Sequence, residues 1–122
     1  MADFKKLDVW QKARELTINT IRASESMSGS TGSLIRGQLI RATMSVPANI
    51  AEGSAKQSDR EFARYVRIAL GSTTESANHL ILLRDLGAID DRRFAFLDSS
   101  LDEIGRMLTG LEKRLRDDAG EQ

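Results

Sequence analysis

The sequence of 122 residues has no cysteine, a single proline and a single histidine. Without cysteine the chain can form no disulfide, and it offers neither a thiolate nucleophile nor a cysteine ligand for zinc. This absence agrees with a cytoplasmic location, which is the one that we expect. The sequence also lacks a secretory leader and any run of about 18 apolar residues. We therefore expect an untargeted protein that does not enter a membrane.

The chain has no net charge and few aromatic side chains. Eighteen basic residues balance 18 acidic ones, and aromatic residues make up 5% of the chain. The pI is about 6.6, whereas domains that bind nucleic acid strongly usually have a pI above about 9. No glycine-rich phosphate-binding motif is present. We expect no cofactor, no small-molecule substrate and no enzymatic activity.

Apolar residues recur with the period of a helix along most of the chain. The clearest series is a heptad pattern with alternating spacings of three and four: Phe94, Leu97, Leu101, Ile104, Leu108, Leu111 and Leu115. Ser58 followed by Glu61 is a capping box, and Asp90 or Asp91 is a suitable N-cap for the last helix. The pattern predicts an all-α protein, an antiparallel up-and-down four-helix bundle. Its single domain covers residues 1–122, with helices at about 8–26, 33–53, 58–86 and 90–116.

The second predicted helix contains Pro47 and a polar stripe. Pro47 lacks an N–H and its ring clashes with the preceding turn, so we predict a kink. Because the connection at 54–57 is short, the second and third helices should be antiparallel neighbours. We predict a hydrogen-bonded polar seam between them, centred on a buried Arg41–Glu75 ion pair. Its members are Arg41, Ser45, Asn49, Glu52, Glu61, Ser72 and Glu75.

Two interpretations of this seam are open. Polar groups can fix the register of an otherwise apolar bundle, and this is the interpretation we favour. Alternatively, the carboxylates of Glu52, Glu61 and Glu75 could join His79 in a metal-dependent active site. Di-iron bundles use two Glu-x-x-His motifs, whereas here the only histidine follows Glu75 by four residues. We therefore predict neither catalytic nor metal-binding residues.

Several segments together resemble a known family. They are SVPANIAEG at 45–53, S-x-x-EF at 58–62, IALGS-x-x-E at 68–75, FKKLDVWQKARELT at 4–17 and the run Gln38–Ala42. The chain is similar here to the small four-helix-bundle proteins encoded in 23S rRNA intervening sequences. Relatives of that family include the accessory variability proteins of diversity-generating retroelements. The resemblance implies an antiparallel four-helix protomer, a homopentamer and no known catalysis. For the retroelement relatives it also implies binding of nucleic acid and reverse transcriptase.

An oligomer needs apolar surface outside the core of each protomer. Phe96 and Met107 lie off the heptad seam of the last helix, and Trp10 is the only tryptophan. We predict that Trp10, Phe96 and Met107 contribute to the subunit interface. Gly37 and Gly71 lie inside predicted helices, where glycine costs about 1 kcal/mol relative to alanine. We interpret both as positions of close helix approach.

Nucleic-acid binding is the main alternative function. Lys56, Arg60, Arg64 and Arg67 cluster around the start of the third helix, and a symmetric oligomer would repeat them as a ring. Asp59 and Glu61 beside them favour an ordinary solvated surface instead. We predict a non-catalytic oligomeric scaffold or adaptor, with RNA or DNA binding through these cations as the alternative.

Overall fold

The structure is a computed structural model that describes residues 3–27 and 29–120. One short 3₁₀ helix, η1 (Phe4–Lys6), precedes four α-helices: α1 (Asp8–Ser24), α2 (Ser30–Ser54), α3 (Asp59–Asp85) and α4 (Asp91–Asp118). No strand occurs in these two ranges, which confirms the predicted all-α class. The largest difference in bounds is at α2, which begins at Ser30 rather than Ser33. The helix starts directly after Gly29, whose φ of 87° provides the turn.

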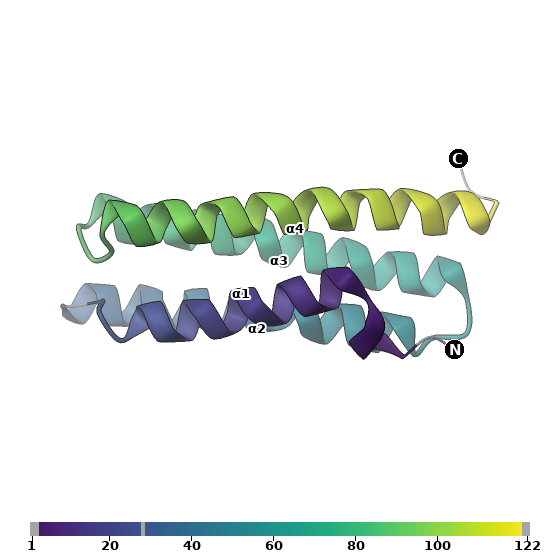
Figure 1. The fold of residues 1–122 in the computed structure, drawn as a ribbon, viewed down its shortest axis with the longest axis horizontal. Coiled ribbons are helices and arrows are strands. Elements are labelled where there is room, and N and C mark those ends of the chain that lie inside the picture. Colours follow the sequence, from purple (N-terminus) through teal and green to yellow (C-terminus); the bar gives the residue numbers. More distant parts are fainter. Residues whose placement is uncertain (1–2, 28, 121–122) are drawn as a thin grey trace.

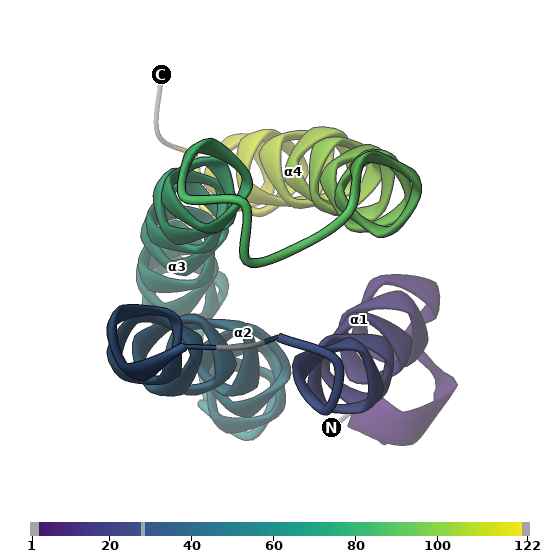
Figure 2. The same cartoon turned by 90° about the vertical axis from the view of Figure 1, so that its left-hand side faces the viewer.

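The helices pack as a bundle in which each helix runs opposite to the one before it, as the colours of Figure 1 show. Viewed from the end in Figure 2, α2 and α3 form one side of the bundle and α1 and α4 the other. The contact between α2 and α3 is the most extensive of the four between neighbouring α-helices, and that between α1 and α4 is the least extensive. The bundle therefore has one tightly packed side and one looser side.

The core contains the heptad series predicted for the last helix. Leu97, Leu101, Ile104, Leu108 and Leu115 are buried, and Phe94 and Leu111 are half-buried against them. Each fully buried leucine or isoleucine contributes about 1.5–3 kcal/mol relative to an exposed one. The heptad pattern therefore identified the inward face of α4 correctly.

Side chains cap several helix ends. The Ser58 Oγ accepts a hydrogen bond from the Glu61 N–H at 3.1 Å, and the Asp90 Oδ1 accepts one from the Arg93 N–H at 2.8 Å. Both caps agree with the sequence. The end of α1 has a cap that the sequence analysis missed. The Arg36 guanidinium of α2 donates to the Ser24 carbonyl at 3.3 Å and to the Met27 carbonyl at 3.0 Å, satisfying carbonyls that have no helical partner.

Pro47 lies within α2, which continues through it to Ser54. A proline cannot donate to the carbonyl four residues before it, which here is that of Thr43. The Thr17 hydroxyl of α1 donates to this carbonyl at 3.0 Å. A neighbouring helix thus replaces the hydrogen bond that the proline removes. The kink predicted at Pro47 stays a prediction.

The helical glycines differ from what we predicted. A Cβ at Gly37 or Gly71 would meet nothing within 4 Å, so these are not positions of close helix approach inside the protomer. The close approach is at Gly53, where a Cβ would lie 2.7 Å from the Cβ of Tyr65 and 2.9 Å from the Phe62 ring. Gly53 therefore determines how closely the end of α2 approaches the start of α3.

Candidate functional site

The uncharged members of the predicted polar seam join α2 to α3. The Ser72 hydroxyl donates to the Ser45 Oγ at 2.8 Å across the two helices. The Asn49 amide donates to the Ser45 Oγ at 2.9 Å and to the Ser45 carbonyl at 2.8 Å. Ser72 is buried, and Ser45 and Asn49 are half-buried. These three side chains form a small network that favours one register of the α2–α3 pair.

The charged members lie outside this network. Arg41, Glu52, Glu61 and Glu75 are all exposed. Among the described residues no ion pair joins Arg41 to Glu75, so the predicted buried ion pair is wrong. The Ser72 hydroxyl is bonded to Ser45, whereas Arg41 and Glu75 lie on the exposed outer surface of their helices.

Glu75 has a different partner, the only histidine. Its Oε2 lies 3.3 Å from the His79 Nε2, and the Glu75 side chain is 56% exposed. Residues 3–27 and 29–120 contain no group of three or more His, Cys, Asp or Glu side chains that could hold a metal ion. Glu52 and Glu61 thus do not join this pair, and the described side chains lack the ligand set of a di-iron bundle.

The four candidate nucleic-acid-binding cations do not form one continuous patch. The Lys56 Nζ and the Arg64 guanidinium lie over the Tyr65 ring, at 5.2 and 4.7 Å from its centroid. Arg67 instead pairs with Glu112 of α4 at 3.0 Å. Arg60 is exposed at the start of α3. The arrangement at Tyr65 is the one that could present two cations and an aromatic ring to a ligand.

The three candidate interface residues all come from α1 and α4. Trp10 is half-buried and makes an edge-to-face contact with Phe4, with 5.0 Å between the ring centroids. Met107 is half-buried against the core. Phe96, by contrast, is 57% exposed. Their role in a subunit interface stays a prediction.

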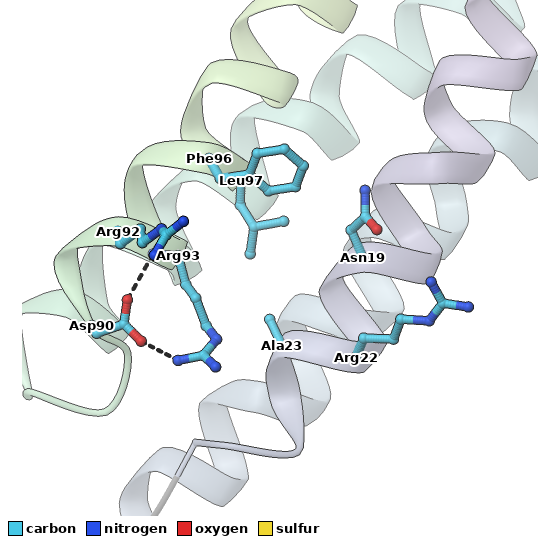
Figure 3. A pocket seen from close by; sticks show the side chains of 8 residues that line it. All are labelled: Asn19, Arg22, Ala23, Asp90, Arg92, Arg93, Phe96 and Leu97. Carbon is cyan, nitrogen blue, oxygen red and sulfur yellow. Dashed lines mark hydrogen bonds and ion pairs between the residues drawn. The ribbon is translucent and has the colours of Figure 1, made fainter.

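Phe96 borders a pocket of about 640 Å³ between the end of α1 and the start of α4, which we call the α1–α4 pocket. Figure 3 shows the Phe96 ring reaching from α4 toward Asn19 of α1, with Leu97 and Ala23 also lining the space. The remaining lining residues are charged: Arg22, Asp90, Arg92 and Arg93.

Asp90 has two functions at the rim of this pocket. Its Oδ1 caps α4, and its Oδ2 pairs with the Arg93 guanidinium. The hydrogen bond from the Arg93 backbone N–H, reinforced by the guanidinium of the same residue, lowers the pKa of Asp90 below its ordinary value of 3.8. Asp90 is therefore ionised at neutral pH and holds Arg93 beside the pocket.

Sequence reasoning missed the pocket, although it had identified Phe96. A signal was present in the sequence. Arg92 and Arg93 lie in the first turn of α4, after its N-cap Asp90. Asn19 and Arg22 lie near the end of α1, which ends at Ser24. Only the packing of the first helix against the last brings the two pairs together.

Comparisons with known proteins agree with the fold. A protein of unknown function from the S23 ribosomal protein family of Bacteroides thetaiotaomicron VPI-5482 superposes with a TM-score of 0.80 at 24% identity, over 86% of this chain and 98% of that one. No curated protein matches the chain. No helix in the described ranges is both long and apolar enough to cross a membrane. The model of the 23S rRNA-intervening sequence protein family matches residues 5–110, most of the chain. This chain therefore belongs to the family of 23S rRNA-intervening sequence proteins.

Proposed function

We propose that this protein is a non-catalytic, homo-oligomeric scaffold or adaptor of the cytoplasm, assembled through the outer face of α2 and α3. The observation that carries the proposal is a continuous exposed stripe of mainly apolar and small residues on each of these two helices. The resemblance to intervening-sequence proteins implies that the oligomer is a pentamer.

The stripe on α2 has the spacing of a packing face, although nothing in the protomer covers it. It consists of five exposed residues at alternating intervals of three and four: Leu34, Gly37, Arg41, Met44 and Ala48. The Leu34 and Met44 side chains are 70% and 53% exposed. A 3-4 repeat on the outside of a bundle is what a second helix would need in order to pack there.

The stripe on α3 matches it. Ile68, Gly71, Glu75, Asn78 and Leu82 have the same alternating spacing and are all exposed, and Leu86 extends the series. Five of the eight large apolar side chains that are exposed among the described residues belong to these two helix stripes: Leu34, Met44, Ile68, Leu82 and Leu86. Monomeric proteins rarely expose large contiguous apolar patches, which supports a subunit contact on this face.

The small and charged residues of the stripes fit the same proposal. A Cβ at Gly37 or Gly71 would meet nothing within 4 Å in the protomer, and a glycine on a helix surface permits the backbone of another subunit to approach closely. Arg41 and Glu75 carry opposite charges on this face. The ion pair that the sequence suggested within one protomer can therefore form between two copies.

Native mass measured by light scattering tests this proposal. The wild-type protein should have an oligomeric mass, and Met44→Glu should reduce it to that of the protomer while the helical circular dichroism is retained. Met44 is exposed, so glutamate there does not disturb the protomer core. Phe96→Glu, an exposed apolar residue on the other side of the bundle, tests the competing prediction that Trp10, Phe96 and Met107 form the interface. The proposal is wrong if Phe96→Glu dissociates the oligomer and Met44→Glu does not.

The cations around Tyr65 favour a second candidate function, RNA or DNA binding. Lys56 and Arg64 place two positive charges over the Tyr65 ring, and such cations could neutralise the phosphates of a strand. Addition of mixed RNA should then raise the mass of the complex at low salt and not at high salt. Arg64→Gln should weaken this binding, whereas Arg14→Gln, an exposed arginine on α1, should not. If Arg64→Gln leaves the affinity for RNA unchanged, RNA does not bind at the cations around Tyr65.

A further inference from the structure

We propose that the α1–α4 pocket binds an aromatic phosphomonoester, the chemistry of a nucleoside 5′-monophosphate. The site is separate from the α2–α3 face and from the cations around Tyr65, so the inference does not depend on the proposed function. It rests on the size of the pocket, its positive charge and the exposed ring at its edge.

The size of the pocket suits a small ligand. Its volume of about 640 Å³ lies within the range of about 300–1,000 Å³ that is usual for small-molecule sites. The pocket lies between the end of α1 and the start of α4, the least extensively packed pair of neighbouring α-helices. Because both walls are helices, the backbone positions of the residues that line it are fixed.

The charge of the pocket selects an anion. Three arginines and one aspartate are among the residues that line it, which gives a formal net charge of two positive units. Asp90 is already paired with Arg93, and neither Arg22 nor Arg92 has an ion-pair partner in the part of the chain that the structure describes. A phosphate dianion would neutralise this excess, and guanidinium groups bind phosphate oxygens through paired hydrogen bonds.

The apolar part of the pocket selects an aromatic ring. The Phe96 side chain is 57% exposed although it borders the pocket, and Leu97 beside it is buried. A planar base stacked on Phe96 would cover this ring. Figure 3 shows Asn19 on the opposite wall facing the ring, and its amide carries both a donor and an acceptor for the edge of a base. Phosphate alone would leave both groups unused.

Calorimetric titration of the full-length protein with AMP, adenosine and inorganic phosphate tests the inference. We expect AMP to bind at least about tenfold more tightly than either fragment, because two parts of the pocket act together. Phe96→Ala should lower the AMP affinity to about that of phosphate, and Arg92→Gln should lower it to about that of adenosine. Met44→Ala and Arg14→Gln remove comparable exposed side chains elsewhere and should leave AMP affinity unchanged. Circular dichroism should confirm that every variant keeps its helices.

The same chemistry can come from a free mononucleotide or from the phosphorylated end of a nucleic-acid strand. Two trinucleotides, one with a 5′-phosphate and one with a 5′-hydroxyl, distinguish these sources. If only the phosphorylated one binds with an affinity similar to that of AMP, the strand end is a ligand. Binding of AMP without binding of either trinucleotide identifies the free nucleotide, and both results support the site. The inference is overturned if AMP binds no more tightly than phosphate, or if Phe96→Ala and Arg92→Gln leave its affinity unchanged.

Discussion

Replacing Thr17 with valine should measure the cost of having Pro47 inside α2. Valine keeps the shape of threonine and removes the hydroxyl that donates to the Thr43 carbonyl at 3.0 Å. Thr43 is fully buried, and Pro47 cannot supply the missing donor. An unsatisfied buried acceptor costs about 1–3 kcal/mol. Because the Thr17 side chain is itself only half-buried, we expect a loss of about 1–2 kcal/mol in the free energy of unfolding.

A double-mutant cycle with Pro47→Ala isolates this effect. Alanine at position 47 restores an N–H that can reach the Thr43 carbonyl, so the cost of Thr17→Val should fall below about 0.5 kcal/mol in that background. Thr20→Val is the matched control. The Thr20 hydroxyl donates to the Leu16 carbonyl at 2.7 Å, a carbonyl to which the helix already supplies an N–H. Its removal should therefore have the same small effect with or without Pro47→Ala.

Urea unfolding followed by circular dichroism provides the free energies, with the midpoint compared at constant slope. All variants should be measured at one protomer concentration, because assembly raises the apparent stability of the protomer. The reasoning is refuted if Thr17→Val costs the same in the presence and absence of Pro47→Ala. It is also refuted if Thr20→Val shows the coupling that we assign to Thr17.

Three further changes test other contacts. Gly53→Ala would place a Cβ 2.7 Å from that of Tyr65. Because of this overpacking, urea unfolding should show a free energy of unfolding lower by about 1–3 kcal/mol. An unchanged free energy would mean that α2 and α3 can move apart without cost. Arg36→Met removes the donor to the Ser24 carbonyl at the end of α1 and to the Met27 carbonyl just beyond it. This change should cost about 1–2 kcal/mol, which Arg36→Lys should recover only in part. The pKa of Asp90 is lowered by the backbone N–H and guanidinium of Arg93. The stabilisation by Asp90 is therefore complete above the pKa of the unfolded state and is lost as the pH falls through the lower pKa of the folded state. Asp90→Asn should make the free energy of unfolding fall less steeply with decreasing pH. An unchanged dependence of this free energy on pH would contradict the prediction.

The sequence predicted the local features of the fold well. The heptad series of α4 and the caps at Ser58 and Asp90 depend on spacing within a few residues, and the structure confirms them. The bond between Thr17 and the Thr43 carbonyl had no such signal, because it joins a common side chain to a backbone group on another helix. The contacts of Arg36 were missed for the same reason.

The errors arose where two helices had to be aligned. A register symmetric about the α2–α3 connection places Ser45 opposite Ile68, whereas Ser45 is bonded to Ser72. Side chains at i and i+4 share a helix face, so the shift by one turn preserved a polar contact. The predicted burial of Arg41 and Glu75 was wrong because both side chains lie on the exposed outer surface of α2 and α3. Gly53 provides the physical reason for the shift, because its missing Cβ allows Tyr65 to approach closely. The periodicity of either helix alone does not contain this information.

The two sides of the bundle therefore suit different roles, and the roles need not interfere. The exposed stripes lie on α2 and α3, where the hydrogen bond between Ser45 and Ser72 and the close contact at Gly53 make the pair of helices rigid. The α1–α4 pocket lies on the opposite side (Figure 2), where packing is least extensive. A ligand changes an assembly equilibrium only if its affinity differs between the assembled and free states. Because no residue of the two stripes lines the α1–α4 pocket, assembly through the proposed α2–α3 face would leave Phe96 accessible, and ligand binding should leave the oligomeric mass unchanged.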